Sequence, residues 1–321
     1  MSKHTKIWLI VAAALILLGA ILFVGVMSTM GWNFKNLSTV RYETNEYEIS
    51  ETYQSISVLA DTADIVFVPS EDGTTSVTCY EEQRMKHAVS VKDGTLVIEL
   101  VNTKKWYHYI GISFGSPKIT ISIPAGAYEA LSVKASTGDV KISQDFGFER
   151  VNVSLSTGDA TCYASVSEEL KIRTSTGDIR LENLMAGTVD LRASTGSINV
   201  SSLICTGTIK TAVSTGCTTL SNVTCGSLIS SGSTGDLHMN DVIASGKFEI
   251  ERDTGDVKFE RCDATEIFIE TDTGNVKGSL LSEKVFIVDT DTGSKDVPKT
   301  VTGGRCEITT STGDIKIAIV D

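Results

Sequence analysis

The chain has 321 residues and a formal net charge of −12, from 28 basic and 40 acidic residues. The acidic excess excludes a nucleic-acid partner, because phosphate recognition needs a concentrated basic surface, and 41% hydrophobic against 21% charged residues excludes a wholly disordered chain. The 27 glycines accompany only 4 prolines, which favours many tight turns between uninterrupted strands.

An uncharged apolar segment occupies residues 7–27, with the sequence IWLIVAAALILLGAILFVGVM. As a helix it spans about 31 Å, the thickness of a membrane's hydrocarbon core. Lys3 and Lys6 precede it, so the positive-inside rule predicts a cytoplasmic N-terminus (1–6), one transmembrane helix (7–27) and an extracytoplasmic remainder at the cell membrane. A cleaved signal peptide is the alternative, although no convincing small-x-small site follows Val26.

Residues 28–50 are predicted to form a juxtamembrane tether, and residues 51–134 an N-terminal β cap that shields the following array from edge-to-edge association. Asp61–Asp64 looks like a degenerate copy of the corner described below. The cap includes the densest aromatic cluster of the chain. We interpret it as a loop packed over the cap or, alternatively, as a contact loop for carbohydrate or protein. The interaction candidates in it are Trp106, Tyr107, Tyr109 and Phe114.

Residues 135–321 contain ten copies of Ser/Asp-Thr-Gly, spaced 19 or 20 residues apart. This period is too short for paired-helix repeats and fits one coil of a β-solenoid. Apolar residues recur two and four positions after the glycine and five and seven before it, which predicts two alternating segments per coil. The glycines are Gly138, Gly158, Gly177, Gly196, Gly216, Gly235, Gly255, Gly274, Gly293 and Gly313.

Stacking the coils about 4.8 Å apart pairs their backbone groups and merges their apolar positions into one core. We therefore predict an all-β fold: a single-stack, parallel β-helix-like solenoid with coils of 19–20 residues, preceded by one transmembrane α-helix. At each corner, glycine permits a positive φ, the preceding Ser or Asp can bond the backbone two residues on, and the threonines form one ladder.

Aspartates follow or precede the corner in most coils, and stacked carboxylates invite a hard cation such as calcium. Turn chemistry alone explains most of them, so calcium is the weaker hypothesis, and no other cofactor is expected. The calcium candidates are Asp236, Asp253, Asp256 and Asp272.

The 7 cysteines include no C-x-x-C pair, and the 4 histidines are dispersed, so no zinc site is predicted. Cys205 and Cys225 occupy equivalent places in adjacent coils, where a disulfide is feasible. Ile315, Ile317 and Ile319 form a final half-coil without a polar cap. This predicts that the C-terminal coil meets a partner or associates with a second copy.

The runs ASTGDVKI, LSTGDATC, TSTGDIRL, DTGDVKF and STGDIKI, with the anchor helix and the strand ending SIPAG, resemble the bacterial putative-adhesin family of β-strand repeat proteins. The resemblance covers about residues 53–321. That family is a domain of unknown function, and some relatives resemble products of Lia-type envelope-stress operons. The resemblance implies the fold and brings no catalytic motif.

Three functions follow as hypotheses. The first is a non-enzymatic, membrane-anchored cell-surface protein whose solenoid is an adhesin or interaction scaffold for a cell-wall glycan or a protein. The second is an accessory protein of envelope-stress signalling that acts through a membrane partner. The third is a polysaccharide-acting β-helix enzyme, which short coils disfavour because they leave little room for a catalytic cleft.

Overall fold

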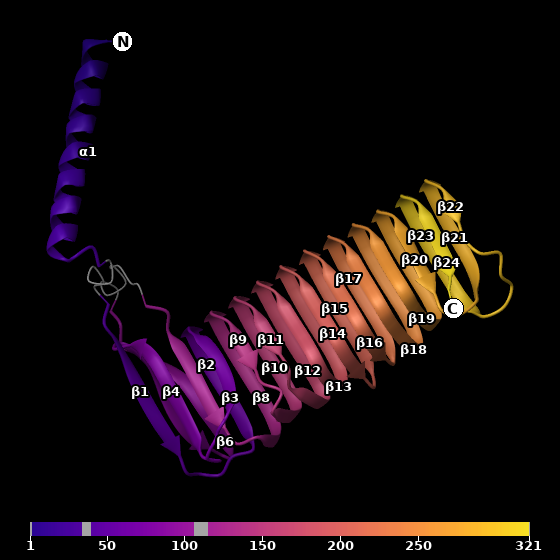
Figure 1. Ribbon diagram of the computed structural model, residues 1–321, viewed down its shortest axis with the longest axis horizontal. Helices are drawn as coiled ribbons and strands as arrows, with labels where there is room; N and C mark the ends of the chain where they lie inside the picture. The colour runs from indigo at the N-terminus through magenta and orange to yellow at the C-terminus, as the bar shows by residue number, and fades with distance from the viewer. Residues whose placement is uncertain (1, 34–39, 106–114, 321) are drawn as a thin grey trace.

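The computed structural model describes residues 2–33, 40–105 and 115–320. Helix α1 (Lys3–Thr29) begins after Ser2, whose hydroxyl accepts a hydrogen bond from the Thr5 N–H. Within the described chain it is the one helix long and apolar enough to cross a membrane (Figure 1). Of its residues only Met27 is buried. The rest of the apolar surface of α1 is therefore not covered by the described part of the chain.

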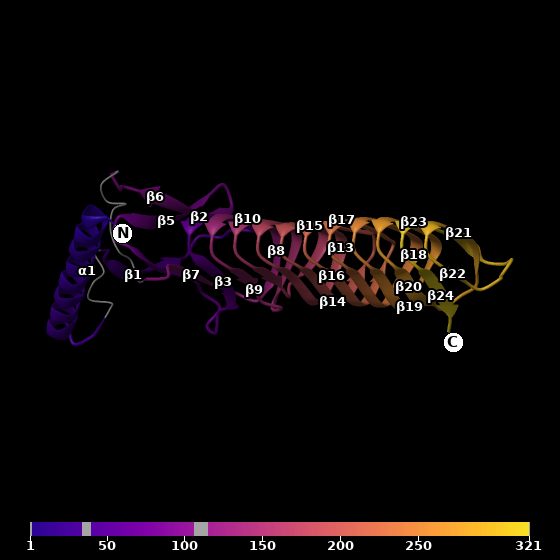
Figure 2. The same cartoon turned by 90° about the horizontal axis from the view of Figure 1, so that it is seen from above.

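The predicted solenoid is confirmed: parallel strands stack coil upon coil along one axis (Figures 1 and 2). Successive corner threonines pair in register, as do the apolar positions beside them. The strands of the regular array are β8 (Gly126–Thr137), β9 (Val140–Ile142), β10 (Phe146–Thr157), β11 (Ala160–Cys162), β12 (Ser165–Thr176), β13 (Ile179–Thr195), β14 (Ile198–Cys205), β15 (Thr208–Thr215), β16 (Thr218–Cys225), β17 (Ser227–Thr234), β18 (Leu237–Thr254) and β19 (Val257–Thr273).

Each regular coil has three alternating segments rather than the two predicted. In β14 the inward positions are Ile198 and Val200, then Leu203 and Cys205, because Ser201 and Ser202 both point outward. The shift occurs at a second corner, six residues after the glycine, where Ser202 has a φ of 54°. Equivalent positive φ angles occur at Asn183, Asn222, Asp241 and Arg261. Short polar side chains tolerate this conformation best, which explains four of the five.

The first corner requires glycine for two reasons. Gly177 has a φ of 139°, which L side chains rarely adopt, and a Cβ there would lie 2.1 Å from the carbonyl oxygen of Gly158 in the neighbouring coil. The same close approach recurs along the stack. A Cβ on Gly274, for example, would lie 2.0 Å from the carbonyl oxygen of Gly255. All ten repeat glycines therefore lie in one close-packed stack.

The cap continues the same ladders with altered strand order. The coil of β2 and β3 pairs in parallel with β8 and β9, and Ala63 lies beneath Gly138 as the degenerate corner predicts. The coil of β6 and β7 lies outside it, and β1, β4 and β5 add antiparallel strands at the end. The strands are β1 (Tyr42–Ile49), β2 (Ser55–Thr62), β3 (Asp64–Pro69), β4 (Thr75–Glu82), β5 (Met85–Lys92), β6 (Thr95–Asn102) and β7 (Lys118–Ile123). Part of the range predicted as a tether is thus the end strand β1.

At the far end the coils are not stacked in sequence order. The strands are β20 (Val276–Leu280), β21 (Lys284–Thr292), β22 (Lys295–Asp296), β23 (Gly304–Thr312) and β24 (Ile315–Ile319). β23 lies between β19 and β21, and β24 lies between β20 and β22. The chain therefore leaves one position of the stack open after β19 and β20, forms β21 and β22 beyond it, and then returns to fill the open position with β23 and β24. Pro298 lies in the returning loop.

The prediction that the C-terminal coil forms a bare end for self-association is wrong for this reason. Ile315 is buried between β20 and β22, and Ile317 is buried beside Gly278 of β20. Ile319 pairs with Leu280 of β20 and is half-buried. The outermost strand of one wall is β21, which carries Asp289 and Asp291, and charged side chains of this kind discourage pairing at an edge.

The order of the last coils can be tested by cross-linking in a Cys217→Ser background, since Cys217 is the only exposed cysteine of the described chain. Thr309 pairs with both Glu270 and Asp289, whereas Glu270 and Asp289 lie two strand spacings, about 10 Å, apart. We expect Glu270→Cys with Thr309→Cys to form a disulfide on oxidation, and Glu270→Cys with Asp289→Cys to remain reduced. The opposite result, read by non-reducing electrophoresis, means sequential stacking.

The close approach at the corner gives a second prediction. Gly177→Ala should lower the free energy of unfolding by about 3 kcal/mol or more, because strain and backbone collision add. Gly94→Ala is the matched control: its φ is 72°, but nothing lies within 4 Å of a Cβ there. It should cost only about 1 kcal/mol. Equal losses in urea unfolding would show that conformation alone fixes the corner glycine.

Candidate functional site

The corner aspartates form a hydrogen-bonded column. In this column a side-chain oxygen accepts from the backbone N–H of the equivalent residue in the next coil, at 2.7–3.0 Å. The bond thus joins coils, instead of joining a residue before the glycine to its own turn as predicted. The acceptors are Asp64, Asp139, Asp159, Asp178, Asp236, Asp256, Asn275 and Asp314.

The four calcium candidates occupy two different sides of the corner. Asp236 and Asp256 belong to the column, where Lys258 Nζ lies 4.0 Å and 3.0 Å from their carboxylates. Asp253 and Asp272 precede the corner and are exposed. The four do not converge as a group of ligand atoms within the described chain. Protein donors already relieve the repulsion between the stacked carboxylates, so calcium stays an untested hypothesis without added geometric support.

Two further sets of residues noted in the sequence have different outcomes. Trp106, Tyr107, Tyr109 and Phe114 lie outside the described residues. Cys205 and Cys225 are buried free thiols, and Cys205 donates to the Gly187 carbonyl at 3.2 Å. Burial, with a smaller effect of Cys205, raises the pKa of the Cys225 thiol to about 12. The structure therefore supports two inert thiols and no disulfide.

A surface groove of about 710 Å³ crosses five coils, from β8 to β14. Tyr128, Phe148 and Val166 line it at one side, and the exposed Met185 and Ile204 at the other. The rings of Tyr128 and Phe148 stack with their centroids 5.7 Å apart. Register shifts between β10 and β12 and between β12 and β13 occur in the same coils and coincide with the hollow. The apolar spacing of the sequence does not indicate this groove.

Two acidic side chains, Glu129 and Glu149, also line this groove, and its lining contains no Lys or Arg. Nearby, Arg150 pairs with Glu168 and also lies 3.8 Å from the Glu149 carboxylate, so of the two lining carboxylates only Glu129 has no ion pair within the described chain. The groove is therefore apolar at its floor, with the free carboxylate of Glu129 at its rim.

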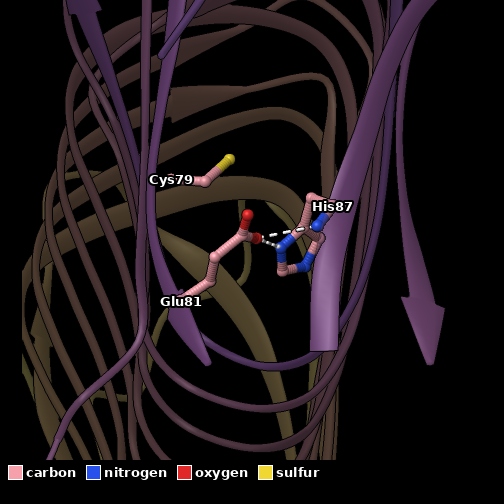
Figure 3. Close-up of side chains that lie close together, drawn as sticks. All are labelled: Cys79, Glu81 and His87. Atoms are coloured by element: carbon pink, nitrogen blue, oxygen red, sulfur yellow. Dashed lines mark hydrogen bonds and ion pairs between the residues drawn. The ribbon is translucent and has the colours of Figure 1, made fainter. Parts of the chain in front are cut away.

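A buried polar cluster in the cap was also missed. Cys79 and Glu81 on β4 face His87 on β5, and the three residues are 0%, 1% and 4% exposed (Figure 3). Their ligand atoms all lie within 4.8 Å of one another, and no other such group of three occurs in the described ranges. The sequence did offer one signal for this cluster. Cys79 and Glu81 are two residues apart in β4, so both fall on the buried face of the strand, while the residues between and beside them face outward.

The aspartate column predicts a defined response to acid. Burial by itself raises the pKa of Asp256, but hydrogen bonds from Asn275 and Lys258 more than offset it, so the pKa lies below the ordinary 3.8. A depressed pKa stabilises the fold above pH 3.8 and this stabilisation is lost as the pH falls further. Asp256→Asn, which keeps the acceptor as Asn275 does, should flatten this acid dependence in thermal unfolding. At pH 7 it should unfold within a few degrees of wild type.

Asp256→Ala is the paired variant. It removes the acceptor for the Asn275 N–H and should cost about 1 kcal/mol at pH 7. A loss of the same size in Asp256→Asn would mean that charge, and not the hydrogen bond between coils, stabilises this corner.

Comparisons with known proteins agree with this architecture. A putative adhesin from Parabacteroides merdae superimposes with a TM-score of 0.52 at 10% identity, over 75% of this chain and 97% of that one. A putative adhesin from Parabacteroides distasonis gives 0.51 at 13%, over 76% and 98%. One from Bacteroides fragilis gives 0.43 at 15%, over 87% and 97%. At these identities the likeness to the two Parabacteroides structures shows the fold alone.

No curated protein sequence matches the chain. The family model of Toastrack DUF4097 matches residues 53–215 and 212–321, which together include the cap and the whole array. The chain therefore belongs to the Toastrack DUF4097 family.

Proposed function

We propose that this protein is a membrane-anchored, non-enzymatic binding protein of the cell surface, with its N-terminus in the cytoplasm and its solenoid outside as an interaction scaffold. The apolar surface of α1 supports the anchor, because 27 residues of helix with one buried side chain need lipid around them. The names of the adhesin structures with the same fold support a binding role.

The groove over β8–β14 is the observation that carries the binding role. The exposed aliphatic side chains of Met185 and Ile204 form a contact surface that a glycan does not require. The rim carboxylate of Glu129, which has no ion pair within the described chain, attracts positive charge. An extended protein segment with apolar and basic side chains fits both features, over a length of about 20 Å along five coils. We therefore assign a protein partner rather than a polysaccharide.

Two exposed residues of the groove offer a direct test. Met185 and Ile204 are 60% and 56% exposed, so the double variant Met185→Glu/Ile204→Glu should fold normally while placing charge in the contact. Retention of the solenoid without α1 (residues 40–321) on isolated cell envelopes should fall at least about tenfold, the equivalent of 1.4 kcal/mol. The helix is left out because it would insert into the envelope membrane by itself.

The matched control is Val301→Glu, because Val301 is 88% exposed in the loop at the opposite end of the solenoid. This variant should be retained like wild type. Protease treatment of the envelopes should abolish retention. Retention that survives protease but is lost after glycan digestion would replace the protein partner with a polysaccharide, and equal retention of both variants would remove the groove from the proposal.

A further inference from the structure

The cluster of Cys79, Glu81 and His87 joins the two walls of the cap. β4 belongs to one wall and β5 to the other, with only Gln83 and Arg84 between them. His87 is the one buried residue of β5. It meets the inward-facing side chains of Cys79 and Glu81 on β4, at the N-terminal end of the core (Figure 3).

The carboxylate of Glu81 is costly in this place, because even a relaxed buried charge loses several kcal/mol of hydration. Three donors reach it: the His87 N–H at 2.7 Å, His87 Nδ1 at 2.6 Å and Asn45 Nδ2 at 2.7 Å. The Cys79 thiol makes no hydrogen bond to a described residue. A polar network satisfied only in part is expensive to retain.

The three side chains offer sulfur, oxygen and nitrogen to one point. A thiolate and a carboxylate carry two negative charges, which one divalent cation neutralises without leaving net charge in the core. Calcium and magnesium prefer oxygen ligands alone, whereas zinc accepts Cys, His and carboxylate together.

We propose that Cys79, Glu81 and His87 bind a divalent cation of the zinc type, which ties β4 to β5 and closes the core at this end. Binding displaces two protons, the thiol proton of Cys79 and the proton shared by His87 Nδ1 and Glu81. Asn45, bonded to Glu81 from β1, holds the carboxylate as an outer partner. The fourth position is open to water. The site is independent of the surface groove and of the proposed function.

Cobalt(II) provides the probe, because a thiolate ligand gives it a charge-transfer absorption. The full-length protein, kept in detergent and stripped with a chelator, should bind one Co²⁺ with this absorption and lose it when Zn²⁺ is added. Cys79→Ser should abolish the absorption, and His87→Gln and Glu81→Gln should weaken binding about tenfold or more. Zn²⁺ should also raise the unfolding temperature of wild type, a readout that needs no variant.

Two cysteine variants are matched controls. Cys217→Ser removes the exposed thiol and Cys162→Ser removes a buried thiol elsewhere in the core; both should keep the absorption. The proposal is overturned if stripped wild type shows neither the absorption nor a zinc-dependent rise in unfolding temperature. It is also overturned if the absorption survives Cys79→Ser and disappears in Cys217→Ser, which would mark adventitious binding at the surface thiol.

Discussion

The close approach of one corner glycine to the next determines how this solenoid is built. The carbonyl oxygen of Gly158 lies 2.1 Å from the place where a Cβ on Gly177 would be. The coils cannot separate to make room, because their spacing is set by hydrogen bonds such as that from the Gly177 N–H to the Thr195 carbonyl, 2.9 Å long. A coil displaced by one residue would put a side chain into this column, so the glycines fix the register of the whole array.

The register in turn gives the neighbouring columns their chemistry. Because the residue after each glycine is brought beside its counterpart, a carboxylate there meets a backbone N–H that has no partner in its own strand. The bond from the Asp178 N–H to Asp159, at 2.7 Å, is one example. Acidic residues that would repel one another in isolation become acceptors between coils. Ser197 and Cys217 take this position in two adjacent coils and accept no such bond within the described chain, so the column is interrupted there.

Much of the fold could be predicted from the sequence, since period, corner and most inward positions all repeat. The second corner could not, because apolar spacing says little about a shift at Ser202 or Arg261. Inward Arg252 also breaks the pattern. It is 2% exposed, donates a hydrogen bond to Ser230 at 2.8 Å, and fits because Gly232 leaves space for its guanidinium.

The order of the last coils could not be predicted for a different reason: the spacing of the repeat stays regular through Gly293 and Gly313. Lys295, where an apolar residue is usual, was the available sign. Of the candidate sites, the aspartate column could be predicted from the spacing of the repeat. The groove depends on register shifts between strands, and the Cys79 cluster depends on the meeting of the two walls of the cap.

Both ends of the solenoid place a coil out of sequence order, and the two arrangements have the same physical effect. The coil of β23 and β24 is hydrogen-bonded on both sides, although it is the last in the chain. The coil of β2 and β3, the first of the parallel stack, is enclosed in the same way by β6 and β7. In a sequentially stacked array the terminal coil loses only one neighbour when it frays. Here a terminal coil must break hydrogen-bonded ladders on both sides to unfold. The strands that lie at the outer ends of the stack are short, charged or antiparallel. The order of the end coils therefore makes both chain ends of the stack part of its interior.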